Sequence, residues 1–191
     1  MKTIEDQMSF YAAYHQDARN KATHFLGVPA IMLSLFIPLA WIRFEAGGVT
    51  ITAAMVFAAV VLLYYFFLDV PLAIAMLVIT AALVWIGHHI AALGSMQGWI
   101  WFAVLFVGGW ILQLVGHGFE GRKPALADNL FQIFVAPIFL AAEVFFALGY
   151  KPALHQRVSQ RAQLSRAQSA ESSNSLPRTS SRSGASGSRS A

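Results

Sequence analysis

Histidine, asparagine and glutamate side chains lie in two short segments of this sequence at spacings suited to metal binding. The first segment, YHQDARNKATHF, carries His15, Asn20 and His24 directly before a long apolar run. The second, QLVGHGFEGRKPALADNL, carries His117 and Glu120 at the end of another apolar run. Residues three or four apart share one face of a helix, and this spacing separates Asn20 from His24. It also separates His117 from Glu120.

Imidazole and carboxylate groups of this kind bind divalent iron or zinc. A redox-active iron site that leaves coordination positions open commonly uses two histidines and a carboxylate. Three histidines with a nearby acid fit iron and zinc alike, so the ligand types alone leave both metals open. The chain contains no cysteine, which excludes disulfides, zinc knuckles, iron–sulfur clusters and thiolate nucleophiles.

The elements that must position these residues are predicted to be membrane-spanning helices. Of the 191 residues, 57% are hydrophobic and 12% are charged, whereas soluble domains have about a quarter charged residues. A spanning helix needs about 20 mostly apolar residues. Five segments are of this kind: 24–42, 50–67, 70–93, 99–116 and 130–148. The sequence therefore predicts an all-α fold, a polytopic membrane helix bundle with about five transmembrane helices in the lipid bilayer.

The C-terminal segment differs from the rest of the chain in composition. Residues 159–191 are rich in serine and arginine, and with so few apolar side chains they are predicted to form a disordered tail. The predicted boundaries are 1–158 for a membrane helical domain with an interfacial metal site and 159–191 for the tail. Seven of the thirteen basic residues lie from Lys151 onward, so the net charge does not indicate a nucleic-acid partner.

Counting the membrane crossings places the two histidine segments on the same side of the membrane. Each span reverses the direction of the chain, so the start of the first span, the end of the fourth and the start of the fifth share one face. His15 and His24 therefore share a face with His117, and bundling of the helices would bring the three together. The alternative is that three unrelated histidines lie at the interface.

The two segments resemble the motifs of a known family. The pair YHQDARNKATHFLGVP and QLVGHGFEGRKPALADN, followed by a proline and an acid in APIFLAAE, is similar to the membrane family of 2-hydroxy fatty acid dioxygenases, over roughly residues 9–150. The resemblance implies Fe²⁺ as the cofactor, held by His15, His24 and His117, with 2-hydroxy fatty acids and O2 as substrates. It also implies a multi-pass protein of the bacterial inner membrane, or of the endoplasmic reticulum in a eukaryote.

The implied reaction is the oxidative decarboxylation step of fatty acid α-oxidation. A 2-hydroxy acid is converted to CO2 and an acid one carbon shorter, which removes four electrons and meets the full demand of O2 reduction to water. No external reductant is needed, in agreement with a short chain that lacks a GxGxxG nucleotide-binding motif on a strand. Asn20, Glu120 and Glu143 fall within the family-like motifs and are the candidate catalytic residues, without individual roles.

Glu143 presents a conflict within the predicted fifth span. An acid inside an apolar helix is costly and is therefore a candidate functional residue, and it shares a predicted inward face with Gln132. A straight spanning helix would nonetheless place it about 20 Å deeper than the histidines. Either Pro137 bends the helix and returns the acid to the site, which we favour, or Glu143 pairs at the far side with His88 or His89.

Three other polar residues have two interpretations each. Asn20 precedes His24 by one turn, so its amide could support an imidazole or bind a substrate carboxylate. Asparagine is also a favoured N-cap, and Asn20 could simply begin the first helix. Arg122 and Lys123 are candidate substrate-binding residues for the carboxylate, although basic residues beside a span commonly set membrane topology instead.

Two other classes of function remain open from the residues alone. A transporter is expected to place polar groups at the membrane midplane or to show repeated halves, and the chain shows no internal repeat. A structural or interaction protein would not need imidazoles paired across two distant segments. The alternative to the dioxygenase is a membrane transporter, or a structural membrane protein with a metal site of other use. The dioxygenase is therefore the favoured function, and binding of iron or zinc distinguishes it from a protein without a metal site.

Overall fold

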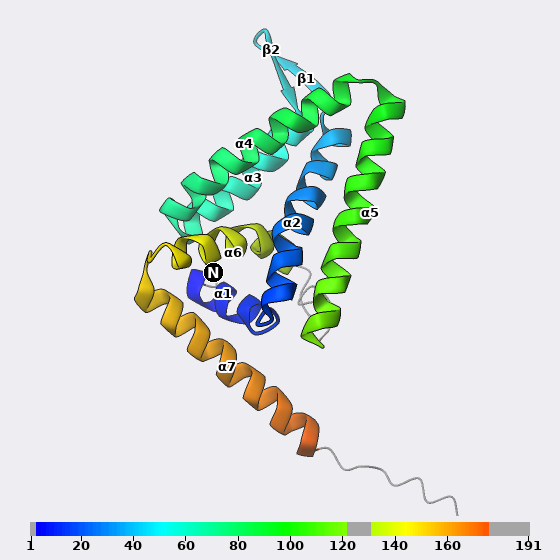
Figure 1. The fold of residues 1–191 in the computed structure, drawn as a ribbon. Coiled ribbons are helices and arrows are strands. Elements are labelled where there is room, and N and C mark those ends of the chain that lie inside the picture. Colours follow the sequence, from blue (N-terminus) through cyan, green and yellow to red (C-terminus); the bar gives the residue numbers. More distant parts are fainter. Residues whose placement is uncertain (1–2, 122–130, 176–191) are drawn as a thin grey trace, which may run out of the picture.

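The structure is a computed structural model that describes residues 3–121 and 131–175. Helices form almost all of it, as predicted, and a small hairpin of two antiparallel strands is the exception (Figure 1). The helices are α1 (Ile4–Ala12), α2 (Ala18–Leu39), α3 (Ala53–Leu68), α4 (Val70–Ala92), α5 (Ser95–Glu120), α6 (Gln132–Ala147) and α7 (Pro152–Ser175). The strands are β1 (Arg43–Ala46) and β2 (Val49–Thr52).

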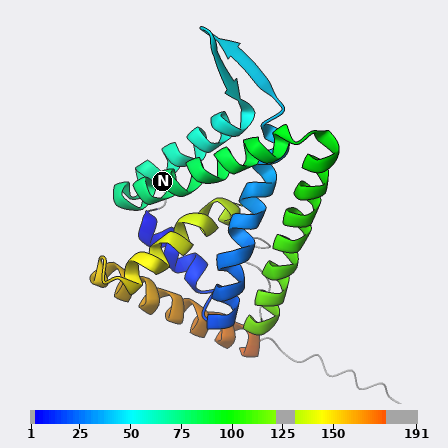
Figure 2. The same ribbon diagram turned by 45° about the horizontal axis from the view of Figure 1, so that its top comes forward.

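The hairpin lies between the first two predicted spans and includes residues 50–52, which were predicted to begin the second span. Its turn consists of Gly47 and Gly48, whose φ angles are 60° and 80°. Two successive residues with positive φ match the right-handed twist of paired strands, and glycine adopts them without strain. The glycine pair therefore closes a short exposed hairpin that projects from one end of the bundle (Figure 2).

The predicted membrane helix bundle is confirmed. Within the described part of the chain, three helices, α2, α4 and α5, are long and apolar enough to cross a membrane. The other two predicted spans are also apolar helices, but α3 and α6 have 16 residues each. A helix of that length measures about 24 Å, which is shorter than the roughly 30 Å of a hydrocarbon layer.

Glycines allow α2 and α5 to pack closely along their length. A Cβ atom added to Gly27 would lie 2.9 Å from the carbonyl oxygen of Gly109. A Cβ added to Gly109 would lie 2.6 Å from Cγ1 of Ile31 and 3.0 Å from the carbonyl oxygen of Gly27. Small residues of this kind let membrane helices approach each other backbone to backbone. This close packing brings the first turns of α2 beside the last turns of α5.

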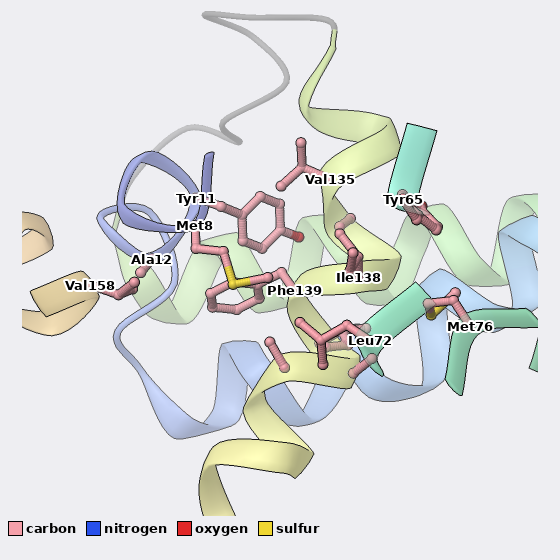
Figure 3. Packing of buried hydrophobic residues seen from close by; sticks show 14 of the residues in the cluster. Met8, Tyr11, Ala12, Tyr65, Leu72, Met76, Val135, Ile138, Phe139 and Val158 are labelled. Carbon is pink, nitrogen blue, oxygen red and sulfur yellow. The ribbon is translucent and has the colours of Figure 1, made fainter. Parts of the chain in front are cut away.

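Helix α6 runs steeply across α2 rather than beside it (Figures 1 and 2). It is almost enclosed, because α1, α2 and α4 all pack against it. Figure 3 shows Met8 and Tyr11 of α1 around Phe139 of α6, with Leu72 of α4 on the other side. The rings of Tyr11 and Phe139 lie 4.5 Å apart. This core holds α1, and the loop that follows it, against the rest of the bundle.

The C-terminal helix α7 continues past the predicted domain boundary at residue 158. Its apolar residues Leu154, Val158 and Ala162 recur every four positions and are buried. Its arginines pair with acids of α1: Arg157 lies 2.8 Å from Glu5, and Arg161 lies 3.0 Å from the same residue. The structure therefore differs from the predicted disordered tail over 159–175, while 176–191 lie outside the described residues.

Candidate metal centre

Three different elements bring the histidines together. His15 lies in the loop between α1 and α2, His24 lies in the second turn of α2, and His117 lies in the last turn of α5. Their exposed fractions are 2%, 2% and 6%. One ring nitrogen from each lies within 4.8 Å of the others. The structure thus brings together the three residues that the counting of membrane crossings placed on one face.

The hydrogen bonds of two of these rings leave a lone pair on each Nε2 atom. Nδ1 of His15 donates to the carbonyl oxygen of Tyr11 at 2.8 Å, and Nδ1 of His24 donates to the carbonyl oxygen of Asn20 at 2.8 Å. A carbonyl oxygen only accepts, so each neutral ring carries its proton on Nδ1. Such a bond to one ring nitrogen commonly orients the other toward a metal ion.

The two Nε2 atoms of His15 and His24 face each other at 3.1 Å. With both protons on Nδ1, two lone pairs point at one another, an arrangement that a cation between them would stabilise. Metal–nitrogen bonds of about 2.1 Å place neighbouring ligand atoms about 3 to 3.5 Å apart. This spacing, together with His117 nearby, shows that the donor set fits a divalent transition-metal ion.

The surroundings keep His15 uncharged. Burial, reinforced by the neighbouring His24, lowers the pKa of His15 to about 2, so its ring is neutral and able to bind a metal at physiological pH. The ring of Tyr11 stacks on it with a centroid distance of 3.9 Å and an interplanar angle of 3°. Nδ1 of His117 is buried and has no hydrogen-bond partner among the described residues.

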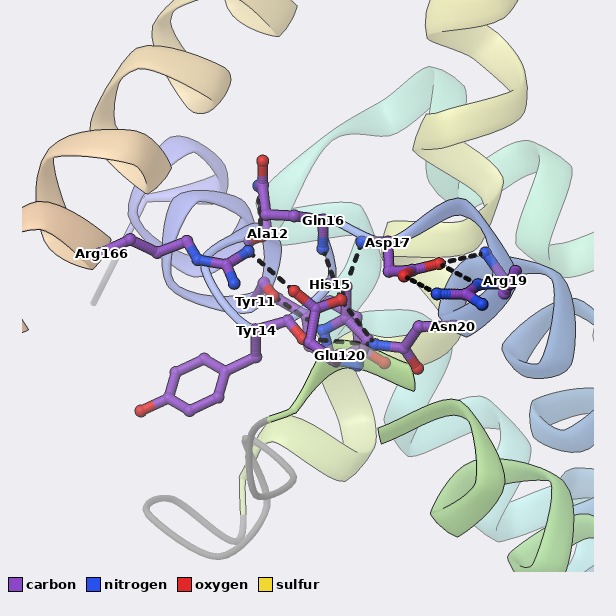
Figure 4. A network of polar contacts seen from close by, with 10 residues as sticks. All are labelled: Tyr11, Ala12, Tyr14, His15, Gln16, Asp17, Arg19, Asn20, Glu120 and Arg166. Carbon is purple, nitrogen blue, oxygen red and sulfur yellow. Dashed lines mark hydrogen bonds and ion pairs between the residues drawn. The ribbon is translucent and has the colours of Figure 1, made fainter. Parts of the chain in front are cut away.

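Glu120 binds the loop that carries His15 (Figure 4). Its Oε2 atom accepts hydrogen bonds from the backbone N–H groups of Gln16 and Asp17, at 3.0 and 2.8 Å. Oε2 also accepts from the Asn20 amide at 3.2 Å, and Oε1 accepts from Arg166 at 2.7 Å. The side chain is 1% exposed. Glu120 is therefore a buried anchor with four donors.

Asn20 supports the site from within α2. Asp17 is the N-cap of this helix, since its side chain accepts from the N–H of Arg19, so the N-cap interpretation of Asn20 is wrong. Asn20 is 0% exposed, its carbonyl oxygen holds His24, and its amide donates to Glu120. It connects the histidine of α2 to the anchor on α5.

Glu143 lies on the same side of the bundle as the histidines. Its Oε2 atom pairs with Nζ of Lys21 at 2.7 Å, and Lys21 directly follows Asn20. The steep crossing of α6 over α2 brings the acid there without an interruption of the helix. His88 instead contacts Thr52 at 3.0 Å. The alternative in which Glu143 pairs with His88 or His89 is therefore wrong.

The two predicted substrate-binding residues, Arg122 and Lys123, fall outside the described residues.

A cavity beside the histidines adds residues that sequence reasoning missed. Its volume is about 200 Å³, and Gln113 and Trp110 line it. Gln113 precedes His117 by one helical turn, and that spacing could have identified it.

Comparisons with known proteins identify the family of this chain. A family model described as 2-hydroxy-palmitic acid dioxygenase Mpo1-like matches residues 1–93 and 90–148, which include all three histidines. The 2-hydroxy-palmitic acid dioxygenase MPO1 of Saccharomyces cerevisiae is 33% identical over 154 residues, or 79% of this chain and 84% of the yeast protein. No solved structure matches the chain. The chain belongs to the Mpo1-like family of 2-hydroxy-palmitic acid dioxygenases.

Proposed function

We propose that the protein is an Fe(II)-dependent dioxygenase that converts 2-hydroxy fatty acids to fatty acids one carbon shorter. The observation that carries this proposal is the opposed pair of Nε2 atoms of His15 and His24, which lie 3.1 Å apart and beside His117. The similar yeast protein is named for action on 2-hydroxy-palmitic acid. The histidine site provides a place for the metal that such an oxidation uses.

The proposed reaction balances without a further reductant. A 2-hydroxy acid and O2 give CO2, water and the shortened acid, as the bond between C1 and C2 breaks and C2 becomes the new carboxyl carbon. When bound by the histidines, iron would act as a Lewis acid toward the substrate oxygens and supply the redox chemistry for O2. His15 and His24 are held for this role by the carbonyl groups of Tyr11 and Asn20.

The cavity beside the histidines suits a long acyl chain. It follows one face of α2 from His24 to Phe36, a rise of about 18 Å along the helix. C–C bonds of about 1.5 Å advance an extended chain by about 1.3 Å each, so the hydrocarbon part of a 16-carbon 2-hydroxy acid has a similar length. Phe36 and Phe57, with ring centroids 6.4 Å apart, lie at the far end.

The apolar lining gives the acyl chain a place outside water while the acid end stays near the membrane interface. The face of α2 contributes Val28, Ile31 and Leu35, and α3 contributes Val61. Arg122 and Lys123, which follow α5 in sequence, remain our candidates for attracting the substrate carboxylate. We also propose that the protein resides in the membrane as a multi-pass protein, which lets lipid-derived substrates reach the cavity without leaving the bilayer.

Product analysis tests the proposal directly. The purified full chain, supplied with Fe²⁺, air and 2-hydroxyhexadecanoic acid, is expected to yield pentadecanoic acid in a mass spectrum. Hexadecanoic acid, which lacks the 2-hydroxyl group, and an incubation without O2 are the controls and are expected to give no shortened product. A protein that binds iron yet leaves the 2-hydroxy acid unchanged would refute the proposed reaction.

A substitution at Asn20 tests its support of the site. In Asn20→Asp, a carboxylate replaces the amide that donates to Glu120, so a hydrogen bond becomes a repulsion between two buried acids. The Asp17 cap of α2 is unchanged. We expect the helical content to persist and turnover to fall at least about 10-fold, the usual effect of losing a residue that supports a metal ligand. Turnover close to that of the unaltered protein would contradict this role.

A further inference from the structure

The buried carboxylate of Glu120 pairs with an arginine that lies in a part of the chain not covered by the family model. That model ends at residue 148, and α7 begins at Pro152. From this helix, Nη1 of Arg166 reaches Oε1 of Glu120 at 2.7 Å (Figure 4). The exposed fractions of the two side chains are 31% for Arg166 and 1% for Glu120.

Glu120 needs this partner because a buried charge without a counter-ion is strongly destabilising. Removing one member of such a pair leaves the charge of the other uncompensated. The three other donors to Glu120 are two backbone N–H groups and one amide. Among the described residues, Arg166 is the cation that pairs with this acid.

Hydrogen bonds connect Glu120 to the segments that hold two of the proposed metal ligands, His15 and His24. Its Oε2 atom holds the N–H groups of Gln16 and Asp17, which directly follow His15 in the loop. The same oxygen holds the amide of Asn20, whose carbonyl oxygen accepts from Nδ1 of His24. A shift of the Glu120 carboxylate would therefore move the loop and both imidazoles that bind through Nε2.

We propose that Arg166 is a positioning residue: by pairing with Glu120 it holds the metal-binding histidines in place, and α7 is therefore needed for metal binding. The helix is placed for this role by its other contacts. Its apolar residues are buried in the same core as those of α1. Helix α1 in turn presents the Tyr11 carbonyl to His15. The proposal rests on the metal site of the proposed function.

The metal affinity of the purified full chain tests this role without reference to turnover. Titration with Fe²⁺ under anaerobic conditions is expected to show binding at least about 10-fold weaker for Arg166→Ala than for the unaltered chain. Arg166→Lys, which restores a positive charge, is expected to recover part of the affinity. Arg161→Ala, which removes two ion pairs from the same helix, is the matched control and is expected to keep the affinity within about 2-fold.

Amide hydrogen exchange supplies a second readout. The N–H groups of Gln16 and Asp17 donate to Glu120, so both are expected to exchange faster in Arg166→Ala while amides in the middle of α5 do not. If the alanine variant fails to fold, Arg166→Gln takes its place, because it keeps a hydrogen-bond donor and loses only the charge.

A double-mutant cycle shows whether Arg166 acts through Glu120. If it does, Arg166→Ala should have little further effect on metal affinity once Glu120→Gln has removed the charge. Additive losses would overturn the proposal, as would an unchanged affinity of Arg166→Ala or an equal loss in Arg161→Ala. If the unaltered chain binds no metal, the metal site and this inference fail together, whereas normal binding by Arg166→Ala rejects only the inference.

Discussion

His24→Ala and His117→Ala should each remove metal from the purified protein. Each imidazole supplies one of three nitrogen donors that lie within 4.8 Å of one another, and alanine offers none. Loss of a residue that merely supports a ligand typically costs 10- to 100-fold in metal affinity, so loss of a ligand should exceed about 100-fold. Measured by elemental analysis after dialysis, both variants are expected to contain no bound iron and to produce no shortened acid.

His89→Ala is the matched control for these variants. It also lies on a long apolar helix, and its Nδ1 atom donates to the carbonyl oxygen of Trp85 one turn earlier, as Nδ1 of His24 does to that of Asn20. It stands outside the cluster of three histidines, so its variant should bind metal as the unaltered protein does. Full metal content in both His24→Ala and His117→Ala would remove the basis of the proposed site.

The convergence of the three histidines was predictable because membrane spans alternate in direction. His15 precedes the first predicted span, His24 begins it and His117 directly follows the fourth, so the number of crossings alone assigns them to one face. The close packing of α2 on α5 then brings the segments together, and Gly109 on α5 was a visible signal for it. Long apolar segments and metal-binding residue types are local properties, which a sequence displays directly.

The path of α6 and the role of α7 were not predictable in the same way. Sequence alone does not reveal that α6 crosses α2 steeply, and this crossing decides where Glu143 lies. Helix α7 is polar in composition, and its stability comes from partners far along the chain, such as Glu5 for Arg157. The anchoring role of Glu120 likewise depends on hydrogen bonds to residues about 100 positions away. Such long-range pairs leave no periodic signal.

A larger side chain at Gly116 is expected to separate the two helices at the metal centre itself. A Cβ atom added there would lie 2.2 Å from Oγ1 of Thr23 and 2.5 Å from Oδ1 of Asn20. Asn20 has little freedom to move away, because Glu120 holds its amide and His24 is bonded to its carbonyl oxygen. Valine at position 116 must therefore push α2 away from α5 beside His117.

Gly116→Val should consequently weaken both the fold and the metal site. Overpacking of a close contact typically costs about 1 to 3 kcal/mol. Each 1.4 kcal/mol of that cost that is lost from the free energy of metal binding lowers the affinity about tenfold. We expect a lower melting temperature and a loss of metal affinity approaching 100-fold. Gly118→Val is the matched control, because a Cβ at Gly118 meets nothing within 4 Å and the intrinsic cost of valine in a helix is the same. Equal metal affinities for the two variants would show that contact between α2 and α5 at Gly116 does not position the histidines.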